Sequence, residues 1–280
     1  GSSASKTDIV CNGATDGTVT GVGTGGTGAL VYDLEDGVGA LIANTTGDAS
    51  GAYTGLGAGT YRVRVTDANA CTTVSSNVVI ANPVLLSAGT TQSTYNTFGV
   101  SCNGENDGYI EVTAAGGTGA YTFTLGGTSS AVQTQPGTVY RFNSLVAGAY
   151  TVDVVDANAC SITQIDITLT EPTAIGAAGS VTNLKNGSDV SCNGASDGEI
   201  TAVGSNGSGG YTYVLNEDLA NTTGNEKGVY TGLSSGSYTV TITDSNGCDA
   251  TTTTITVTDP TAVGSSASKT DIVCNGATDG

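Results

Sequence analysis

Hydrophobic and polar residues alternate along this chain in short blocks, and the same blocks occur three times. Each block places large apolar residues at every second position, which is the spacing of a β-strand that buries one face. The polar residues between them are then expected to face solvent, among them Arg62 and Arg64 in the first copy. The alternating blocks lie at residues 30–34, 121–125 and 211–215, and again at residues 61–65, 150–154 and 238–242.

These blocks belong to three consecutive units of similar sequence. Each unit carries a C-N-G-x-x-D-G motif and closes with a strand-like run that ends in proline. Residues 1–17 return letter for letter as residues 264–280, so the sequence starts again after 263 residues (264 − 1). We therefore expect three domains and the start of a fourth repeat, a copy of 1–17. The expected boundaries are 1–83, 84–172, 173–260 and 261–280.

The composition favours strands and tight turns over helices. The 280 residues include 43 glycines and only 4 prolines, and Ser, Thr, Asn and Asp are abundant. Six or seven short strands per unit, separated by Gly-rich turns, predict an all-β fold of tandem immunoglobulin-like antiparallel β-sandwiches. No apolar run reaches the roughly 18 residues that a membrane-spanning helix needs, so no membrane insertion is expected in this segment.

The cysteines predict one disulfide in each domain. Only 5% of the residues are aromatic, so each small core is thin, and a bond between its ends would supplement it. A zinc site is not expected, because the chain has no CxxC pair and no histidine. Buried free thiols are the alternative. The predicted pairs are Cys11 with Cys71, Cys102 with Cys160, and Cys192 with Cys248, and Cys274 is unpaired within the segment.

A recurring L-x-x-G-x-Y motif precedes the second alternating block of each unit. Its tyrosines are Tyr61, Tyr150 and Tyr238. The spacing predicts a tyrosine corner, in which the phenol bonds back to the main chain at the edge of a sandwich. A core tyrosine that follows an ordinary glycine turn is the alternative.

The charge and the missing residue types exclude several functions. The chain has 7 Lys+Arg against 25 Asp+Glu, a net charge of −18, so it lacks the clustered cations that bind nucleic acid. Histidine is absent, which removes the usual general base and argues against an enzyme. The glycine pattern at residues 21–26 precedes a strand rather than a helix, and Ser234 in a Gly-x-Ser-x-Gly pattern has no histidine to activate it, so both are expected to be turns.

The acidic loops contain the candidate residues for a calcium site. If the predicted disulfides form, the carboxylate after each C-N-G motif lies beside the Asp and Asn that precede the second cysteine, and such oxygens suit Ca²⁺. Asp and Asn also serve in Asx turns without an ion, which is the favoured interpretation. No other cofactor is expected. The calcium candidates are Asp16, Asp67 and Asn69, then Asp107, Asp156 and Asn158, then Asp197, Asp244 and Asn246.

The combined motifs resemble the SprB-type repeat. They are C-N-G-x-x-D-G, then Gly-Gly-Thr-Gly-Ala-Tyr as at residues 116–121, then L-x-x-G-x-Y, V-x-D-A-N-A-C, and a Thr-rich strand ending in proline. The resemblance covers all three units and implies an extracellular, tandemly arrayed surface adhesin or filament, exported by the type IX system and in some members used for gliding motility. One departure is that Leu34, Leu125 and Leu215 stand where a tryptophan is expected near the third strand.

Three functions follow from these observations. The first is a non-catalytic structural or adhesive segment of a giant repetitive cell-surface protein, whose partners are neighbouring repeats of the same chain or of like chains. The second is a subunit of a pilus-like polymer, in which residues 264–280 add a strand to a neighbour. The third is a module of a secreted enzyme that binds surface glycans. It requires exposed aromatic residues, for which the variable loops offer Tyr53, Tyr140 and Tyr230.

Overall fold

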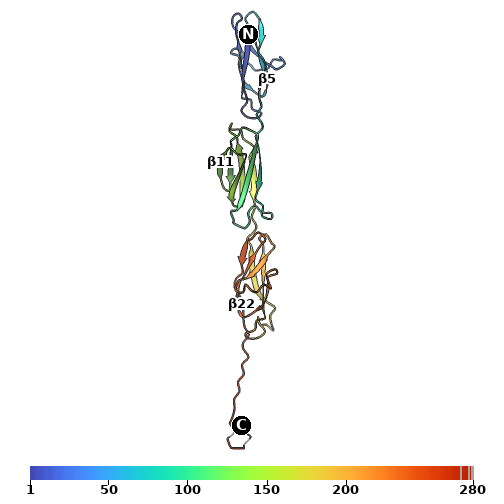
Figure 1. Cartoon of the computed structure of the whole chain (residues 1–280), viewed down its shortest axis with the longest axis vertical. Coiled ribbons are helices and arrows are strands. Elements are labelled where there is room, and N and C mark those ends of the chain that lie inside the picture. The colour runs from blue at the N-terminus through green and yellow to red at the C-terminus, as the bar shows by residue number, and fades with distance from the viewer. Residues whose placement is uncertain (272, 277, 279–280) are drawn as a thin grey trace. The chain divides into compact units, whose positions relative to one another are not determined.

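The computed structural model describes residues 1–271, 273–276 and 278, which form 22 β-strands and no helix (Figure 1). The chain divides into two compact units. Unit 1 contains Gly1–Ser93 and Asn106–Leu169, and unit 2 contains Thr94–Glu105 and Thr170–Gly280. Buried hydrophobic residues of the described chain gather in three clusters, two in unit 1 and one in unit 2. All strands pair in antiparallel fashion, as the alternating pattern predicts.

The first sandwich lies in unit 1. One sheet has the order β1-β2-β4, and the other has the order β3-β5-β6, with β7 also paired to β5. Val19 of β2 and Val63 of β5 are fully buried in the same core, which shows that the two sheets pack face to face. The strands are β1 (Ser2–Thr7), β2 (Gly17–Gly23), β3 (Val31–Asp36), β4 (Ala52–Leu56), β5 (Gly59–Thr66), β6 (Thr72–Val74) and β7 (Val78–Ile80).

The second sandwich also lies in unit 1 and has the same plan. Its sheets are β8-β9-β12 and β11-β10-β13-β14. Phe123 of β10, Phe142 of β12 and Tyr150 of β13 fill the core, which is the most aromatic of the three clusters. The strands are β8 (Ser87–Gln92), β9 (Gly108–Ala115), β10 (Tyr121–Gly127), β11 (Ala131–Gln135), β12 (Val139–Leu145), β13 (Gly148–Val155) and β14 (Ile165–Leu169).

The third sandwich lies in unit 2. Its strands form the sheets β15-β16-β18, β17-β20-β21 and the pair β19-β22. Ile200 of β16, Tyr230 of β18 and Ile242 of β20 are completely buried in its core. The strands are β15 (Gly176–Thr182), β16 (Gly198–Ser205), β17 (Thr212–Leu215), β18 (Val229–Leu233), β19 (Gly236–Tyr238), β20 (Val240–Thr243), β21 (Asp249–Thr251) and β22 (Ile255–Val257).

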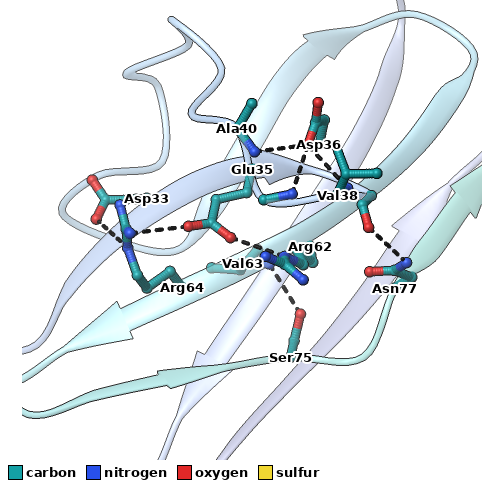
Figure 2. A network of polar contacts seen from close by, with 12 residues as sticks. Asp33, Glu35, Asp36, Val38, Ala40, Arg62, Val63, Arg64, Ser75 and Asn77 are labelled. Carbon is teal, nitrogen blue, oxygen red and sulfur yellow. Dashed lines mark hydrogen bonds and ion pairs between the residues drawn. The ribbon is translucent and has the colours of Figure 1, made fainter.

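A buried carboxylate breaks the alternation in the first sandwich. Glu35 is only 2% exposed, and its two oxygens lie 2.9 Å from Nε of Arg62 and 3.1 Å from a terminal nitrogen of Arg64 (Figure 2). Arg64 also contacts Asp33 at 3.3 Å. The expectation that both arginines face solvent is correct only in part: their side chains are 28% and 31% exposed, but their guanidinium groups turn to neutralise a buried charge on β3.

Candidate functional site: disulfide junctions between repeats

Two disulfides join consecutive repeats. Cys11 of the first repeat bonds Cys160 of the second, with 5.6 Å between the Cα atoms, and both lie in unit 1. Cys102 of the second repeat bonds Cys248 of the third, with 5.7 Å between the Cα atoms, and both lie in unit 2. Both distances are ordinary for a disulfide. In each case the cysteine of a C-N-G motif bonds the later cysteine of the repeat that follows.

The predicted pairing within each repeat is therefore wrong. Cys11 precedes β2 and Cys71 follows β5, and these two strands begin at the same end of the sandwich, where Gly17 pairs with Leu56. The cysteines thus lie at opposite ends, separated by the length of an eight-residue strand, roughly 25 Å, whereas a disulfide tolerates about 7 Å between Cα atoms. Among the described residues, Cys71, Cys192 and Cys274 are free and exposed.

The C-N-G loops, residues 11–14, 102–105 and 192–195, share one set of hydrogen bonds. In the first, the Ala14 N–H donates to the Cys11 carbonyl, and the Asn12 side chain donates to the carbonyl of Pro83 at 2.7 Å. The Gly13 N–H donates to the Asn82 side chain, and Gly13 has a positive φ of 77° that favours glycine. The motif thus ties the first cysteine to the proline that ends its own repeat, a role that the sequence analysis did not assign.

The same arrangement returns in the other two repeats. Asn103 donates to the carbonyl of Pro172, and Asn193 donates to the carbonyl of Pro260, each at 3.1 Å. The glycine N–H of each loop also donates to the side chain that precedes this proline, which is acidic here and is Asn82 in the first repeat. The recurrence of Asn in the motif and of the terminal proline in each unit is the sequence signal that could have identified this contact.

The aspartate loops, residues 67–71, 156–160 and 244–248, carry the second cysteine. Asp156 is 5% exposed, and one carboxylate oxygen accepts the N–H groups of Asn158 and Cys160 at 2.9 Å. The other oxygen accepts the Thr118 N–H at 2.8 Å. Burial alone would raise the pKa of Asp156, but these three donors outweigh it and lower the pKa below its usual value. The ionised aspartate therefore fixes the position of the cysteine.

The other two aspartates act in the same way. Asp244 accepts the N–H groups of Asn246 at 2.9 Å and Cys248 at 3.0 Å, and Asp67 accepts those of Asn69 and Cys71 at 2.9 Å. The pKa of Asp67 is lowered mainly by the Thr27 and Cys71 N–H donors. The Asx-turn interpretation is confirmed for these three loops.

The convergence expected for calcium does not occur. Asp16 accepts the Val10 N–H at the C-N-G end of the first sandwich, while Asp67 and Asn69 lie in the aspartate loop at the other end. Asp197 similarly accepts the Ser191 N–H, away from Asp244. Within the described part of the chain, no three acidic or cysteine side chains form a group that would hold a metal ion.

The residue before the second cysteine adopts a left-handed backbone conformation in every repeat. Its φ is 63° at Ala70, 64° at Ala159 and 86° at Gly247. An alanine in this conformation costs about 1–2 kcal/mol because its Cβ approaches the following carbonyl, and glycine avoids that cost. The third repeat therefore has the least strained aspartate loop.

The junction in unit 2 adds polar contacts around its disulfide. The Asn246 side chain donates to the Ser101 carbonyl at 2.9 Å, and the Asn96 side chain donates to Ser245 at 2.8 Å. Sγ of Cys248 lies 3.3 Å from the same Ser101 oxygen. The segment that leads into the C-N-G loop is thus hydrogen-bonded to the aspartate loop, in addition to the disulfide.

The three predicted tyrosine corners have the expected hydrogen bond. Tyr61 donates to the Gly57 carbonyl at 3.0 Å, four residues earlier in the chain. Tyr150 donates to the Val146 carbonyl at 2.8 Å. Tyr238 donates to the Ser234 carbonyl at 2.9 Å, which places Ser234 in a turn. These bonds fix the turn that leads into the strand carrying the aspartate loop.

The fold and the junctions define a tandem array of immunoglobulin-like β-sandwiches with cross-linked repeats. The family model of the SprB repeat matches residues 94–128 and 186–219, which confirms the resemblance seen in the sequence. Both matched segments start before a C-N-G motif and extend beyond the strand that follows the next glycine-rich turn. A comparison with curated protein sequences gave no match.

Several solved structures are similar to this chain. One holds the three N-terminal domains of the bacteriophage RB49 highly immunogenic outer capsid protein, with 13% identity, 93% of this chain and 99% of that chain covered, and a TM-score of 0.41. A C-terminal intimin fragment in complex with the translocated intimin receptor has 15% identity, coverage of 63% and 64%, and a TM-score of 0.35. The mouse nectin-like molecule 4 ectodomain has 10% identity, coverage of 94% and 97%, and a TM-score of 0.29. Such low similarity says nothing about function.

Proposed function

We propose that this chain is a non-catalytic, extracellular structural segment of a repetitive surface protein, in which disulfides couple each sandwich to the next. The observation that carries the proposal is that both disulfides join one repeat to its neighbour. The bonds therefore do not cross-link the two ends of a single sandwich to supplement its small core. They restrict how far consecutive sandwiches can separate, which is what an adhesive stalk under tensile force requires.

Other features support this proposal. Disulfides persist in oxidising compartments outside the cytoplasm, and a net charge of −18 opposes clumping of like surfaces. No histidine occurs in the sequence, which argues against acid–base catalysis. Where the structure describes the chain, it contains no helix with the length and apolar character needed to cross a bilayer. We extend the proposal to a filament or stalk, and, by analogy with the family alone, to type IX export and gliding motility.

The two alternatives have less support. A strand donated by residues 264–270 of a neighbouring chain would copy β1, but β1 already pairs with β2 along its whole length. A glycan module requires exposed aromatic rings, whereas Tyr53 and Tyr230 are fully buried and Tyr140 packs on Phe142 at a ring distance of 4.8 Å. The variable loops therefore do not offer the exposed tyrosine rings that binding of surface glycans was expected to use.

Single-molecule stretching of the whole chain tests the proposal. In the oxidised protein the shortest covalent route from Cys11 to Cys248 runs through Cys160 and Cys102 and contains about 60 residues, roughly 200 Å when extended. After reduction the same stretch contains about 240 residues, roughly 800 Å. We expect the unfolded length to increase by that difference when a reductant is added. An oxidised chain that already extends to the reduced length would refute the proposal.

A further inference from the structure

Two free cysteines occupy the same positions as bonded ones. Cys192 stands in a C-N-G loop as Cys11 does, and Cys71 stands in an aspartate loop as Cys160 does. Both are free and exposed. We propose that Cys192 and Cys71 are the two halves of a further junction, in which Cys192 of one copy of the 263-residue sequence bonds Cys71 of the next copy.

The loop of Cys192 already has the conformation found in the bonded loops. The Cys192 carbonyl accepts the Ala195 N–H at 3.0 Å, as the Cys11 carbonyl accepts the Ala14 N–H at 3.0 Å. Its Asn193 also reaches the terminal proline of its own repeat. The disulfide is therefore not needed to shape the loop, and the exposed thiol is held ready to bond.

The surroundings of Cys192 match one half of the first junction. A hollow of about 300 Å³ at that junction is lined by both partners, including Asp156, Ala159 and Cys160 of the second repeat. The hollow beside Cys192 is larger, about 450 Å³. Its lining residues are the equivalents of those that the first repeat contributes around Cys11. They are Ser191, Cys192, Asn193 and Pro260–Val263, matching Val10, Cys11, Asn12 and Pro83–Leu86.

The loop of Cys71 matches the other half. Asp67 accepts the Cys71 N–H at 2.9 Å, and Asp156 accepts the Cys160 N–H at the same distance. The Asp67 N–H donates to the Cys71 carbonyl at 3.0 Å, and the Asp156 N–H donates to the Cys160 carbonyl at 2.9 Å. A free and a bonded cysteine are thus presented by the same hydrogen-bonded turn.

The order of the repeats identifies the partner. Both disulfides in this chain join a C-N-G loop to the aspartate loop of the next repeat. Residues 264–280 copy residues 1–17, so the sequence that follows the third repeat is of the first-repeat type, whose aspartate loop contains Cys71. The first repeat is bonded to the second, and the second to the third. By the same pattern, the third repeat of one copy would be bonded to the first repeat of the next copy. This inference rests on the proposed function, because it requires repeats that continue in the same order.

Bond formation is an oxidation of two thiols. Cys192 and Cys71 together give up two protons and two electrons as their sulfur–sulfur bond forms. A small disulfide such as oxidised glutathione accepts them, and its own sulfur–sulfur bond is reduced to two thiols. The structure requires no other reactant.

Two variants of the whole chain test the pairing. Cys71→Ser/Cys274→Ser keeps Cys192, and Cys192→Ser/Cys274→Ser keeps Cys71, so each has one thiol outside the junctions. The two are incubated in a glutathione redox buffer, separately and as an equal mixture. Dimers are measured by intact mass after the unreacted thiols have been blocked. Peptide mapping of the two bonds between repeats controls for folding of both variants.

We expect the mixture to give mainly the heterodimer. It should exceed both homodimers together by about tenfold, the ratio produced by about 1.4 kcal/mol of additional contacts around the bond. Statistical proportions of the three dimers, or no dimer at all, would overturn the proposal. Either result would leave the proposed function standing as long as the Cys11–Cys160 and Cys102–Cys248 bonds are found by mapping. Absence of those two bonds would instead remove the proposed function.

Discussion

Cys11 and Cys160 are 149 positions apart in the sequence, yet their sulfur atoms are bonded and their Cα atoms lie 5.6 Å apart. The bond closes a loop that contains most of the strands of two sandwiches. In the chain-entropy model a loop of this length is worth about 5 kcal/mol. In that model the free energy comes from restricting the unfolded chain, whereas in the folded chain the bond itself limits how far the two sandwiches can separate.

The bond pattern predicts which thiols react. The monomeric 280-residue chain with both disulfides formed should show three accessible thiols, at Cys71, Cys192 and Cys274. Changing Cys160→Ser should expose a fourth, at Cys11, whereas changing Cys71→Ser should only remove one. Alkylation followed by peptide mass mapping measures both results. A peptide that links Cys11 to Cys71 would contradict the structure.

The left-handed residues predict stabilising substitutions. Changing Ala159→Gly should raise the free energy of unfolding of the second sandwich by about 0.5–1 kcal/mol, because glycine removes the Cβ strain at a φ of 64°. The matched control is Ala157→Gly in the same loop, where φ is not positive and glycine should destabilise. Calorimetry of the whole chain measures the shift of the affected transition, and equal effects of the two substitutions would exclude a role for strain.

The aspartate loops predict a loss of stability in acid. The pKa values of Asp156 and Asp244 are lowered in the fold, because the N–H donors outweigh the effect of burial. Their contribution is complete above the unfolded pKa of about 3.9 and is lost as the pH falls through the lower folded values. The melting temperature should therefore drop below about pH 4.

A substitution isolates the part of this effect that comes from Asp156. Asp156→Asn should cost about 1–3 kcal/mol at neutral pH, since an amide offers only one acceptor oxygen to three N–H donors. The second sandwich of this variant should also depend less on pH below about 4. Asp166→Asn, at an exposed position on β14, is the control and should change neither property. An unchanged acid profile in Asp156→Asn would refute the assignment.

The buried ion pairs of Glu35 predict that removing its charge destabilises the first sandwich. Glu35→Gln should destabilise the first sandwich by about 1–2 kcal/mol, because Arg62 and Arg64 lose the charge that compensates them. Glu111→Gln is the comparison, since its pair with Arg141 is more exposed and should contribute less than about 1 kcal/mol. Denaturation at low and high salt separates the two cases, and a larger effect at Glu111 would contradict the structure.

Much of the fold was predictable from the sequence, but the bonding partners of the cysteines were not. Alternation with period two located strands of one sheet in each sandwich, as β5 and β13 illustrate, whereas the strands of the other sheet, such as β2 and β4, were not located by it. The disulfide prediction failed at one connection. If β3 and β4 formed a tight hairpin, β5 would end beside Cys11, and Cys71 would be its natural partner. Residues 37–51 instead return the chain to the end where β3 began, where Gly51 accepts the Gly21 N–H, so β3 and β4 run the same way.

The sequence motifs identified the residues of the site, but they did not predict which of these residues contact one another. The C-N-G and D-A-N-A-C patterns identified the right loops, and the Asx turns follow from their residue types. Contacts between the Asn of one motif and the terminal proline depend on the folded ends of the sandwich. The burial of Glu35 depends on two arginines that face the same side of β5, which alternation alone describes as a solvent face.

The loops closed by the two disulfides overlap between residues 102 and 160. Hydrolysis of any one peptide bond between Cys11 and Cys248 therefore leaves a single covalent molecule, because at least one sulfur bridge spans the break. In the shared stretch two bridges span it. A protein exposed to extracellular proteases would stay covalently connected after such a cut. It would separate into fragments only after a reductant had also cleaved the disulfides.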